Sequence, residues 1–311
     1  CMLNDQAIGA RYLQEKGLAN KILIVDLDVH QGNGTAEIFQ NNNTVFTFSM
    51  HGKSNYPFHK EKSDLDIALE NGTEDAAYLS ILKETLPDLI TKQQPDFIYY
   101  LCGVDVITTG NHVWDQKETM SHIEKENRLL RPKNLFEPSP GKGFGIFTAK
   151  NEMRVGVLNL MGNVFMKKCE DVFEAAEKFM KKYKLKEDYD FLLVDFHGEI
   201  TSEKSAMGHF FDGKATLVVG THTHIPTNDT RILKGGTAYQ TDAGMCGDYD
   251  SVIGMNKENS INRFLKKKST KHFPAIGEAS LCGVIVECDV ETGLAKTVKN
   301  FIHGGELKNS Q

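Results

Sequence analysis

The sequence predicts an α/β fold built around a largely parallel β-sheet that is covered on both faces. Two observations predict it: short apolar runs rich in β-branched residues recur along the chain, and helix-patterned stretches lie between them. A third observation is that His, Asp and Asn residues follow directly after several of these runs. Because parallel sheets bind ligands beyond the carboxyl ends of their strands, we expect a functional site there.

Strands and helices are predicted in order along the chain. Apolar runs favour strands at residues 21–28, 44–50, 96–107, 153–160, 190–196 and 215–220, with a later pair at 237–242 and 280–290. Helical patterns occupy residues 7–16, 76–90, 117–130 and 172–182, and the last carries one apolar stripe that we interpret as a core face. The Pro- and Gly-rich residues 131–143 predict a long loop, and the residues after 304 a polar tail.

Composition disfavours several classes of function. The 311 residues include 36 Lys and Arg against 42 Asp and Glu, a net charge of −6, which argues against a broad basic surface for nucleic acid. The longest apolar run, residues 97–104, is far shorter than the ~20 residues that span a bilayer, and the first residues show no secretory pattern. Six cysteines without a CxxC pair are typical of free thiols in a reducing compartment. We therefore expect a cytoplasmic protein without a membrane segment.

Imidazoles follow predicted strands at three points in the second half of the chain. These points are residues 110–112 (GNH), 195–199 (DFHGE) and 220–224 (GTHTH). Neutral imidazole is the commonest metal ligand near neutral pH, and a divalent site needs several such donors to converge. In an extended strand, side chains at i and i+2 point the same way, so we expect His222 and His224 to face one cavity. The pattern favours a metal site over isolated core histidines.

These segments resemble bacterial calcineurin-like metallophosphoesterases of the type that hydrolyses 2′,3′-cyclic nucleotides. The resemblance runs over residues 103–304 and includes 103–115 (GVDVITTGNHVWD), 195–204, 220–227 and 237–255. It implies a layered αββα-type sandwich and a binuclear metal centre that supplies a hydroxide nucleophile. At the matching positions, one metal would be held by Asn111, His197 and His222, and the other by His224. His112 would be catalytic, contacting the phosphate and assisting the leaving oxygen.

The same family carries carboxylate ligands in a Gly-Asp motif of the first strand and a Gly-Glu-Asn after the next, and neither motif occurs upstream of Gly103. The resemblance therefore implies a divalent metal (Fe, Mn or Zn), ideally two per chain, with one supported by the residues present. The implied function is hydrolysis of a cyclic nucleotide or related small phosphodiester by a metal-activated hydroxide, impaired by the missing carboxylates. Nucleic acid is expected only as short or cyclic nucleotides, and a homo-oligomer is left open.

The N-terminal third is similar to a fragment of another family, the histone deacetylases and acetylpolyamine amidohydrolases. The similarity is clearest at residues 25–35 (VDLDVHQGNGT), 47–51, 66–78 and 100–105. It implies an alternative zinc site at Asp28, His30 and Asp105, with Asp26 in a supporting role. The alternative function is thus a remnant of a zinc-dependent deacetylase or amidohydrolase. The family's His-His general base and its transition-state Tyr have no match here.

The two resemblances meet at residues 103–107, which fit both families and predict a fusion. We expect a deacetylase-like fragment at 1–106, a metallophosphoesterase-like domain at 103–304 and a tail at 305–311. Three interpretations stay open. The N-terminal strands could complete the phosphoesterase sheet and bring Asp28, His30 and His51 to its cavity; the phosphoesterase ligands could hold one metal with vestigial activity; or the composite could be non-catalytic. Phosphodiester chemistry is favoured because its resemblance is longer and keeps more ligands.

Overall fold

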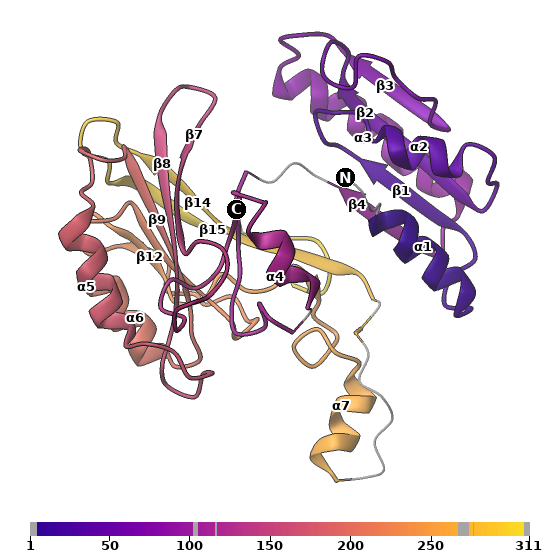
Figure 1. Ribbon diagram of the computed structural model, residues 1–311. Coiled ribbons are helices and arrows are strands. Elements are labelled where there is room, and N and C mark those ends of the chain that lie inside the picture. Colours follow the sequence, from indigo (N-terminus) through magenta and orange to yellow (C-terminus); the bar gives the residue numbers. More distant parts are fainter. Residues whose placement is uncertain (1–4, 102–104, 116, 267–273, 276, 308–311) are drawn as a thin grey trace. The chain divides into compact units, whose positions relative to one another are not determined.

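The chain forms two compact units, Cys1–Asp105 and Val106–Gln311, in a computed structural model (Figure 1). The structure describes residues 5–101, 105–115, 117–266, 274–275 and 277–307. Each unit has its own sheet and its own core, so each is described by itself.

The first unit is a parallel four-stranded sheet in the order β3-β2-β1-β4. Its strands are β1 (Ile22–Asp26), β2 (Val45–Gly52), β3 (Leu65–Leu69) and β4 (Phe97–Leu101). Its helices are α1 (Asp5–Glu15), α2 (Asn33–Phe39) and α3 (Asp75–Gln93). Every residue of β1 is buried, and its side chains alternate between two clusters: Ile22 and Ile24 pack with α1 and α2, whereas Leu23 and Val25 pack with α3. Helices therefore cover both faces of this sheet.

The second unit is a sandwich of two sheets with a layer of helices. Its larger sheet has the order β11-β12-β10-β9-β8-β7, in which the four inner strands are parallel and both edge strands are antiparallel. These strands are β7 (Phe144–Thr148), β8 (Arg154–Met161), β9 (Phe191–His197), β10 (Leu217–Thr221), β11 (Arg231–Ile232) and β12 (Ala238–Gln240). The smaller antiparallel sheet contains β13 (Gly247–Asp248), β14 (Ala279–Cys288) and β15 (Ala295–His303).

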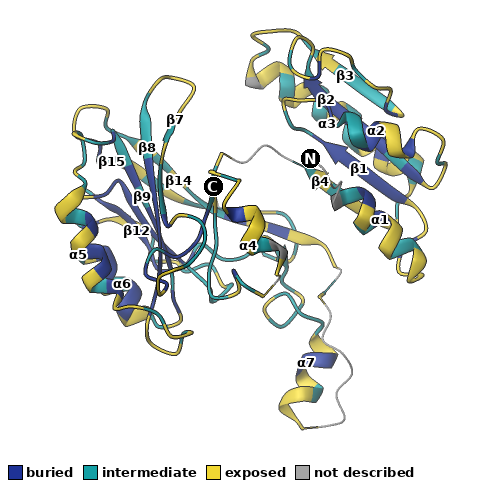
Figure 2. Ribbon diagram, viewed as in Figure 1, coloured by how far each residue is buried: buried dark blue, intermediate teal, exposed yellow. Residues whose placement is uncertain are grey.

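The larger sheet is buried on both faces. Helices α5 (Val172–Lys182) and α6 (Thr201–Phe210) pack on one face, and in Figure 2 their sheet-facing sides are buried while their outer sides are exposed. On the other face, Leu217 and Val219 of β10 pack against Val284, Val286 and Val298 of the smaller sheet. The remaining elements are the short strands β5 (Ile107–Thr108) and β6 (Leu129–Leu130), α4 (Glu118–Ile123) and α7 (Lys257–Phe264).

Helix α5 shows why the local pattern predicted its bounds correctly. Asp171 caps its first turn by accepting a hydrogen bond from the backbone N–H of Glu174 at 2.8 Å. Its predicted stripe is the core face, since Val172, Ala176 and Phe179 are buried. The eight predicted strand positions are likewise occupied by strands, seven of them with bounds within two residues of the predicted ones.

Two predicted elements are wrong in length. Residues 96–107 do not form one strand, because β4 ends at Leu101 and β5 pairs with β6 in a separate two-stranded sheet; residues 102–104 lie outside the described residues. The helix predicted at 117–130 shrinks to Glu118–Ile123 because residues 129–130 pair with β5 instead. Helices α2, α6 and α7 were not predicted, since two of them are short and none shows a wide apolar stripe.

The N-terminal strands do not complete the phosphoesterase sheet. Strand β1 hydrogen-bonds to β2 and β4, and β2 to β1 and β3, so these strands stay within their own sheet. The interpretation in which these strands complete the sheet of the second unit, and so bring Asp28, His30 and His51 to its cavity, is therefore wrong in its strand pairing. His51 is instead buried in β2, where its Nδ1 lies 2.9 Å from the hydroxyl of Ser49.

Candidate metal centre

The candidate site lies at the carboxyl ends of two adjacent parallel strands of the larger sheet. His197 is the last residue of β9 and pairs with Thr221, the last residue of β10. His222 follows directly, and Asn111 lies in the turn after β5. Parallel neighbours end at the same edge, which is why residues far apart in the sequence can meet here.

Three atoms that could bind a metal ion lie close together at this edge. The Nε2 atom of His197 lies 2.9 Å from Oδ1 of Asn111 and 3.1 Å from Nδ1 of His222. The two imidazole rings stand edge to face with centroids 4.8 Å apart. Ligands about 2.1 Å from a shared cation, and at right angles to one another, stand about 3 Å apart. The spacing of these three side chains fits a single metal ion.

The hydrogen-bond partners decide which ring nitrogens carry protons. The hydroxyl of Thr221 donates to Asp195 at 2.8 Å, so its oxygen accepts from Nδ1–H of His197 at 3.0 Å. On the other ring, Nε2 of His222 lies 3.0 Å from a carboxylate oxygen of Glu199, which can only accept. Both protons are thereby assigned to the nitrogens that face away from the centre.

The atoms left at the centre are all acceptors. With the ring protons so assigned, Nε2 of His197 presents its lone pair to Nδ1 of His222 and to the amide oxygen of Asn111. Facing lone pairs at such distances repel, and a cation placed among them would satisfy all three. The donor set therefore fits a divalent metal.

The electrostatics of the site favour neutral rings. Burial lowers the pKa of His197 to about 3, assisted by the neighbouring His222 and Lys204. Burial also lowers the pKa of His222, against the opposing effect of the Glu199 carboxylate. Metal binding requires deprotonated imidazole, so at neutral pH no proton has to be removed before a cation enters.

His224 is placed differently from the strand-based expectation. Strand β10 ends at Thr221, and both His222 (φ 99°) and His224 (φ 69°) have left-handed backbone conformations. The i, i+2 argument from an extended strand is therefore wrong. His224 donates from Nδ1 to the carbonyl of Ile253 at 2.8 Å, which leaves its Nε2 lone pair available. Non-glycine residues in this conformation cost about 1–3 kcal/mol and cluster at functional sites.

His112 follows Asn111 and has its own carboxylate partner. Its Nδ1 lies 2.6 Å from Asp115, whose second oxygen accepts from Lys167 at 2.9 Å. Hydrogen bonds from Lys167 and His112 lower the pKa of Asp115, so it is ionised at neutral pH. The His112 side chain is 74% exposed. An oriented, accessible imidazole can contact a substrate and donate a proton.

Two further features hold the site together. Gly110 packs so tightly that a Cβ there would lie 2.2 Å from Nε2 of His197. Below the loop after β10, the carboxylate of Asp242 accepts from Lys204 at 2.6 Å and from the Thr223 hydroxyl at 2.7 Å, with the Lys204 and Asp242 side chains both 1% exposed. The sequence assigned no role to these supporting residues or to the partners of the rings. Asp115, Glu199 and Thr221 lie within three positions of a site histidine, whereas Lys204 and Asp242 carry no such signal.

The alternative zinc residues are only partly assembled. The carboxylate of Asp28 lies 3.0 Å from Nδ1 of His30, and both side chains are exposed, by 40% and 53%. Asp105 is exposed and, within the residues that the structure describes, is joined to neither by a hydrogen bond or ion pair. Burial raises the pKa of Asp26 to about 6. Over the described part of the chain, no group of three or more His, Cys, Asp and Glu could hold a metal ion, so the acceptor cluster above depends on Asn111.

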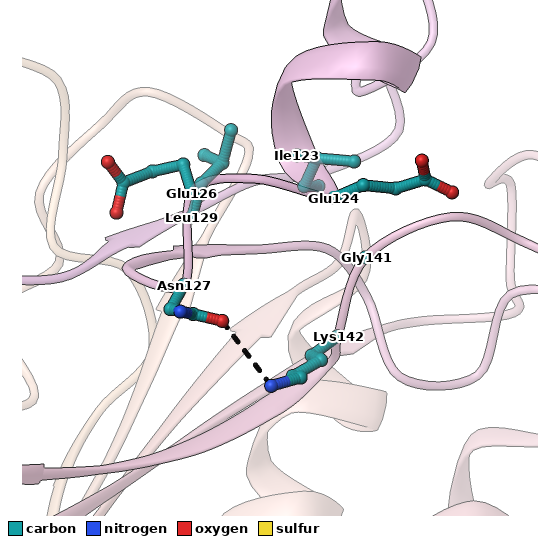
Figure 3. A pocket seen from close by; sticks show the side chains of 7 residues that line it. All are labelled: Ile123, Glu124, Glu126, Asn127, Leu129, Gly141 and Lys142. Carbon is teal, nitrogen blue, oxygen red and sulfur yellow. Dashed lines mark hydrogen bonds between the residues drawn. The ribbon is translucent and has the colours of Figure 1, made fainter.

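The pocket in Figure 3 is separate from these residues. It has a volume of about 160 Å³ and lies at the end of α4, where Nζ of Lys142 is 3.4 Å from Oδ1 of Asn127. It is lined by Ile123, Glu124, Glu126, Asn127, Leu129, Gly141 and Lys142. None of the candidate ligands lines it, so it is not part of the proposed centre. Of the helices described, none has the length and apolar character needed to cross a membrane.

Two family models match the chain. The model of YmdB-like protein matches residues 89–301, and the model of the histone deacetylase domain matches residues 1–130. The two matches overlap at residues 89–130 and so include the junction of the two units.

Individual proteins are also similar to this chain. A 2′,3′-cyclic-nucleotide 2′-phosphodiesterase of Bacillus subtilis is 38% identical over 242 residues, covering 71% of this chain and 90% of the relative. An uncharacterized protein of Picosynechococcus is 53% identical over 130 residues, covering 42% of this chain and 43% of the relative. The crystal structure of a phosphatase from Mycoplasma pneumoniae matches with a TM-score of 0.59 at 29% identity, covering 92% of this chain and 94% of that one. With the YmdB-like match spanning most of its length, the chain belongs to the YmdB-like protein family.

Proposed function

We propose that this protein is a metal-dependent phosphodiesterase that hydrolyses cyclic nucleotides or related small phosphodiesters. The observation that carries the proposal is the close approach of three side chains that can bind a metal, those of Asn111, His197 and His222, at the carboxyl edge of the larger sheet. The Bacillus subtilis relative, named as a 2′,3′-cyclic-nucleotide 2′-phosphodiesterase, supports the same substrate class.

These three residues would hold one divalent cation, Fe, Mn or Zn, and His224 would offer its free Nε2 to a second. When bound, the metal polarises the phosphodiester and lowers the pKa of a bound water, so that hydroxide is available as nucleophile. His112, held at Nδ1 by Asp115, would contact the phosphate through Nε2 and donate a proton to the leaving oxygen. The upstream carboxylates of the resembling family have no counterpart among these contacts, so we expect one metal and slow turnover.

We assign the activity to the metallophosphoesterase-like domain at residues 103–304 and regard residues 1–106 as a deacetylase-like fragment. We also propose a cytoplasmic location, because Cys169, Cys246, Cys282 and Cys288 are free thiols, as is usual in a reducing compartment.

The test is turnover of two substrate classes by the full chain loaded with Mn²⁺, Fe²⁺ or Zn²⁺. We expect hydrolysis of bis-p-nitrophenyl phosphate and of 2′,3′-cyclic AMP, and loss of both in His197→Ala and His222→Ala. His209→Ala, at an exposed position of α6, is the matched control. Turnover of an acetyl-lysine reporter alone, abolished by His30→Ala, would instead assign the activity to the deacetylase-like fragment.

A further inference from the structure

Asp195 is a buried carboxylate that connects several strand ends beneath the candidate metal centre. It lies two residues before His197 on β9 and is 5% exposed. One oxygen accepts from the hydroxyl of Thr221 on β10 at 2.8 Å, and the other from the amide of Asn159 on β8 at 3.3 Å. Burial raises the pKa of Asp195 to about 6, against the opposing effect of the side chains of Thr221 and of Thr108, which lies on β5 three residues before Asn111. Asp195 thus reaches toward the strands that carry all three candidate ligands.

The direction of the hydrogen bonds in this network is determined. A threonine hydroxyl has one proton, and Thr221 gives it to the Asp195 carboxylate, which cannot donate. The hydroxyl oxygen then accepts at 3.0 Å from Nδ1 of His197, which favours the ring proton on Nδ1 over Nε2. Nε2 is left with its lone pair, directed at Asn111 and His222.

We infer that Asp195 and Thr221 are positioning residues that hold the His197 proton on Nδ1 and so keep Nε2 open for a cation. The inference rests on the proposed function for its purpose, but the proton position is a property of the metal-free chain. Without the Thr221 hydroxyl, Nδ1 loses its acceptor in a buried site. The proton is then better placed on Nε2, where it can donate to Oδ1 of Asn111 at 2.9 Å. That hydrogen bond would occupy the position of the metal.

We call the hydrogen bonds from His197 to Thr221 and from Thr221 to Asp195 the relay. Substitutions at Thr221 and Asp195 test its direction. Thr221→Val removes the hydroxyl at nearly constant shape, whereas Thr221→Ser keeps it. Asp195→Asn can reverse the direction of these hydrogen bonds. The amide N–H of the new side chain donates to the Thr221 oxygen, so the Thr221 hydroxyl is free to donate to Nδ1 of His197. Thr227→Val is the matched control, since the Thr227 hydroxyl also donates to a carboxylate, that of Asp229, at 2.7 Å.

The primary measurement is long-range ¹H–¹⁵N correlation of ¹⁵N-histidine-labelled, metal-free protein, with His197 assigned from the spectrum of His197→Gln. We expect the proton on Nδ1 in the wild type, Thr221→Ser and Thr227→Val, and on Nε2 in Thr221→Val and Asp195→Asn. Calorimetric titration should show Mn²⁺ affinity falling roughly 10- to 100-fold in Thr221→Val and recovering in Thr221→Ser, as for other residues that orient metal ligands.

The outcomes separate the inference from the proposed function. Two results would overturn the relay and leave the phosphodiesterase proposal standing. One is that folded Thr221→Val keeps the wild-type proton position and Mn²⁺ affinity. The other is that the wild type itself carries the proton on Nε2. If the proton moves as expected but the wild type neither binds Mn²⁺ nor hydrolyses phosphodiesters, the relay holds and the proposed function fails. Equal loss of affinity in Thr221→Val and Thr221→Ser would also refute the relay, because it would show a packing effect.

Discussion

Replacing Gly110 with alanine should strongly weaken metal binding while leaving the fold intact. The added Cβ would lie 2.2 Å from Nε2 of His197 and 2.4 Å from two of its ring carbons. Ordinary contact begins at 3.4 Å, so the ring has to move by about 1.2 Å (3.4 − 2.2). That displacement is more than a third of the separations of 2.9 and 3.1 Å between His197 and its neighbours Asn111 and His222. A misplacement of about 1 Å costs on the order of 100-fold in a catalytic site.

We therefore expect Gly110→Ala to lower Mn²⁺ affinity and phosphodiester turnover by about 100-fold or more. Overpacking itself should cost about 1–3 kcal/mol of stability, which leaves the unit folded. Calorimetric titration, turnover of bis-p-nitrophenyl phosphate and thermal unfolding measure the three quantities. Gly283→Ala is the control, because a Cβ at Gly283 meets nothing within 4 Å. Wild-type Mn²⁺ affinity in folded Gly110→Ala would refute the placement of the metal beside Nε2 of His197.

Three further perturbations test the supporting structure. Asp242→Ala should destabilise the second unit by about 3–5 kcal/mol in urea unfolding, because the Lys204 ammonium is left buried without its partner. Asp242→Asn should cost less, and a loss below about 1 kcal/mol in Asp242→Ala would contradict the prediction. Asp115→Asn should lower turnover at least about tenfold with unchanged Mn²⁺ affinity, because it weakens the orientation of His112 without touching a ligand; an equal fall in affinity would assign Asp115 to the metal instead. Burial raises the pKa of Asp26 from 3.8 to about 6, so the native state of the first unit holds this proton more tightly than the unfolded state, and stability falls as pH rises from about 4 to 6. Asp26→Asn should remove this loss of stability and stabilise β1 by on the order of 3 kcal/mol at pH 7, seen as slower hydrogen exchange at residues 22–26. If the stability of the wild type did not change between pH 4 and 7, the raised pKa of Asp26 would be contradicted.

Local sequence patterns correctly predicted a helix that buries one face and a strand that is buried along its whole length. The stripe of residues 172–182 gave the bounds of α5, and the apolar run ending at Asp26 gave β1, because every residue of β1 is buried. The same reasoning failed at residues 96–107 and 117–130. There, pairing between β5 and β6, which are about twenty residues apart, overrides the local preference of both segments. Such pairing depends on the tertiary fold and leaves no periodic signal.

The sequence by itself determined the chemistry of the site. The motifs at 110–112, 195–199 and 220–224 contain the histidines and the asparagine, and each motif follows a predicted strand. Only the tertiary structure decided which of them meet and where their protons lie. Asn111 and His197 are 86 positions apart, and His197 and Thr221 are 24 apart. His197 and Thr221 become neighbours because parallel strands are joined by long crossovers, whereas Asn111 comes from the loop after β5 in a separate two-stranded sheet. The proton position of a ring depends on the partners that the tertiary fold brings to it. For the same reason Lys204, which a sequence pattern would place in solvent, is a buried cation beneath the site.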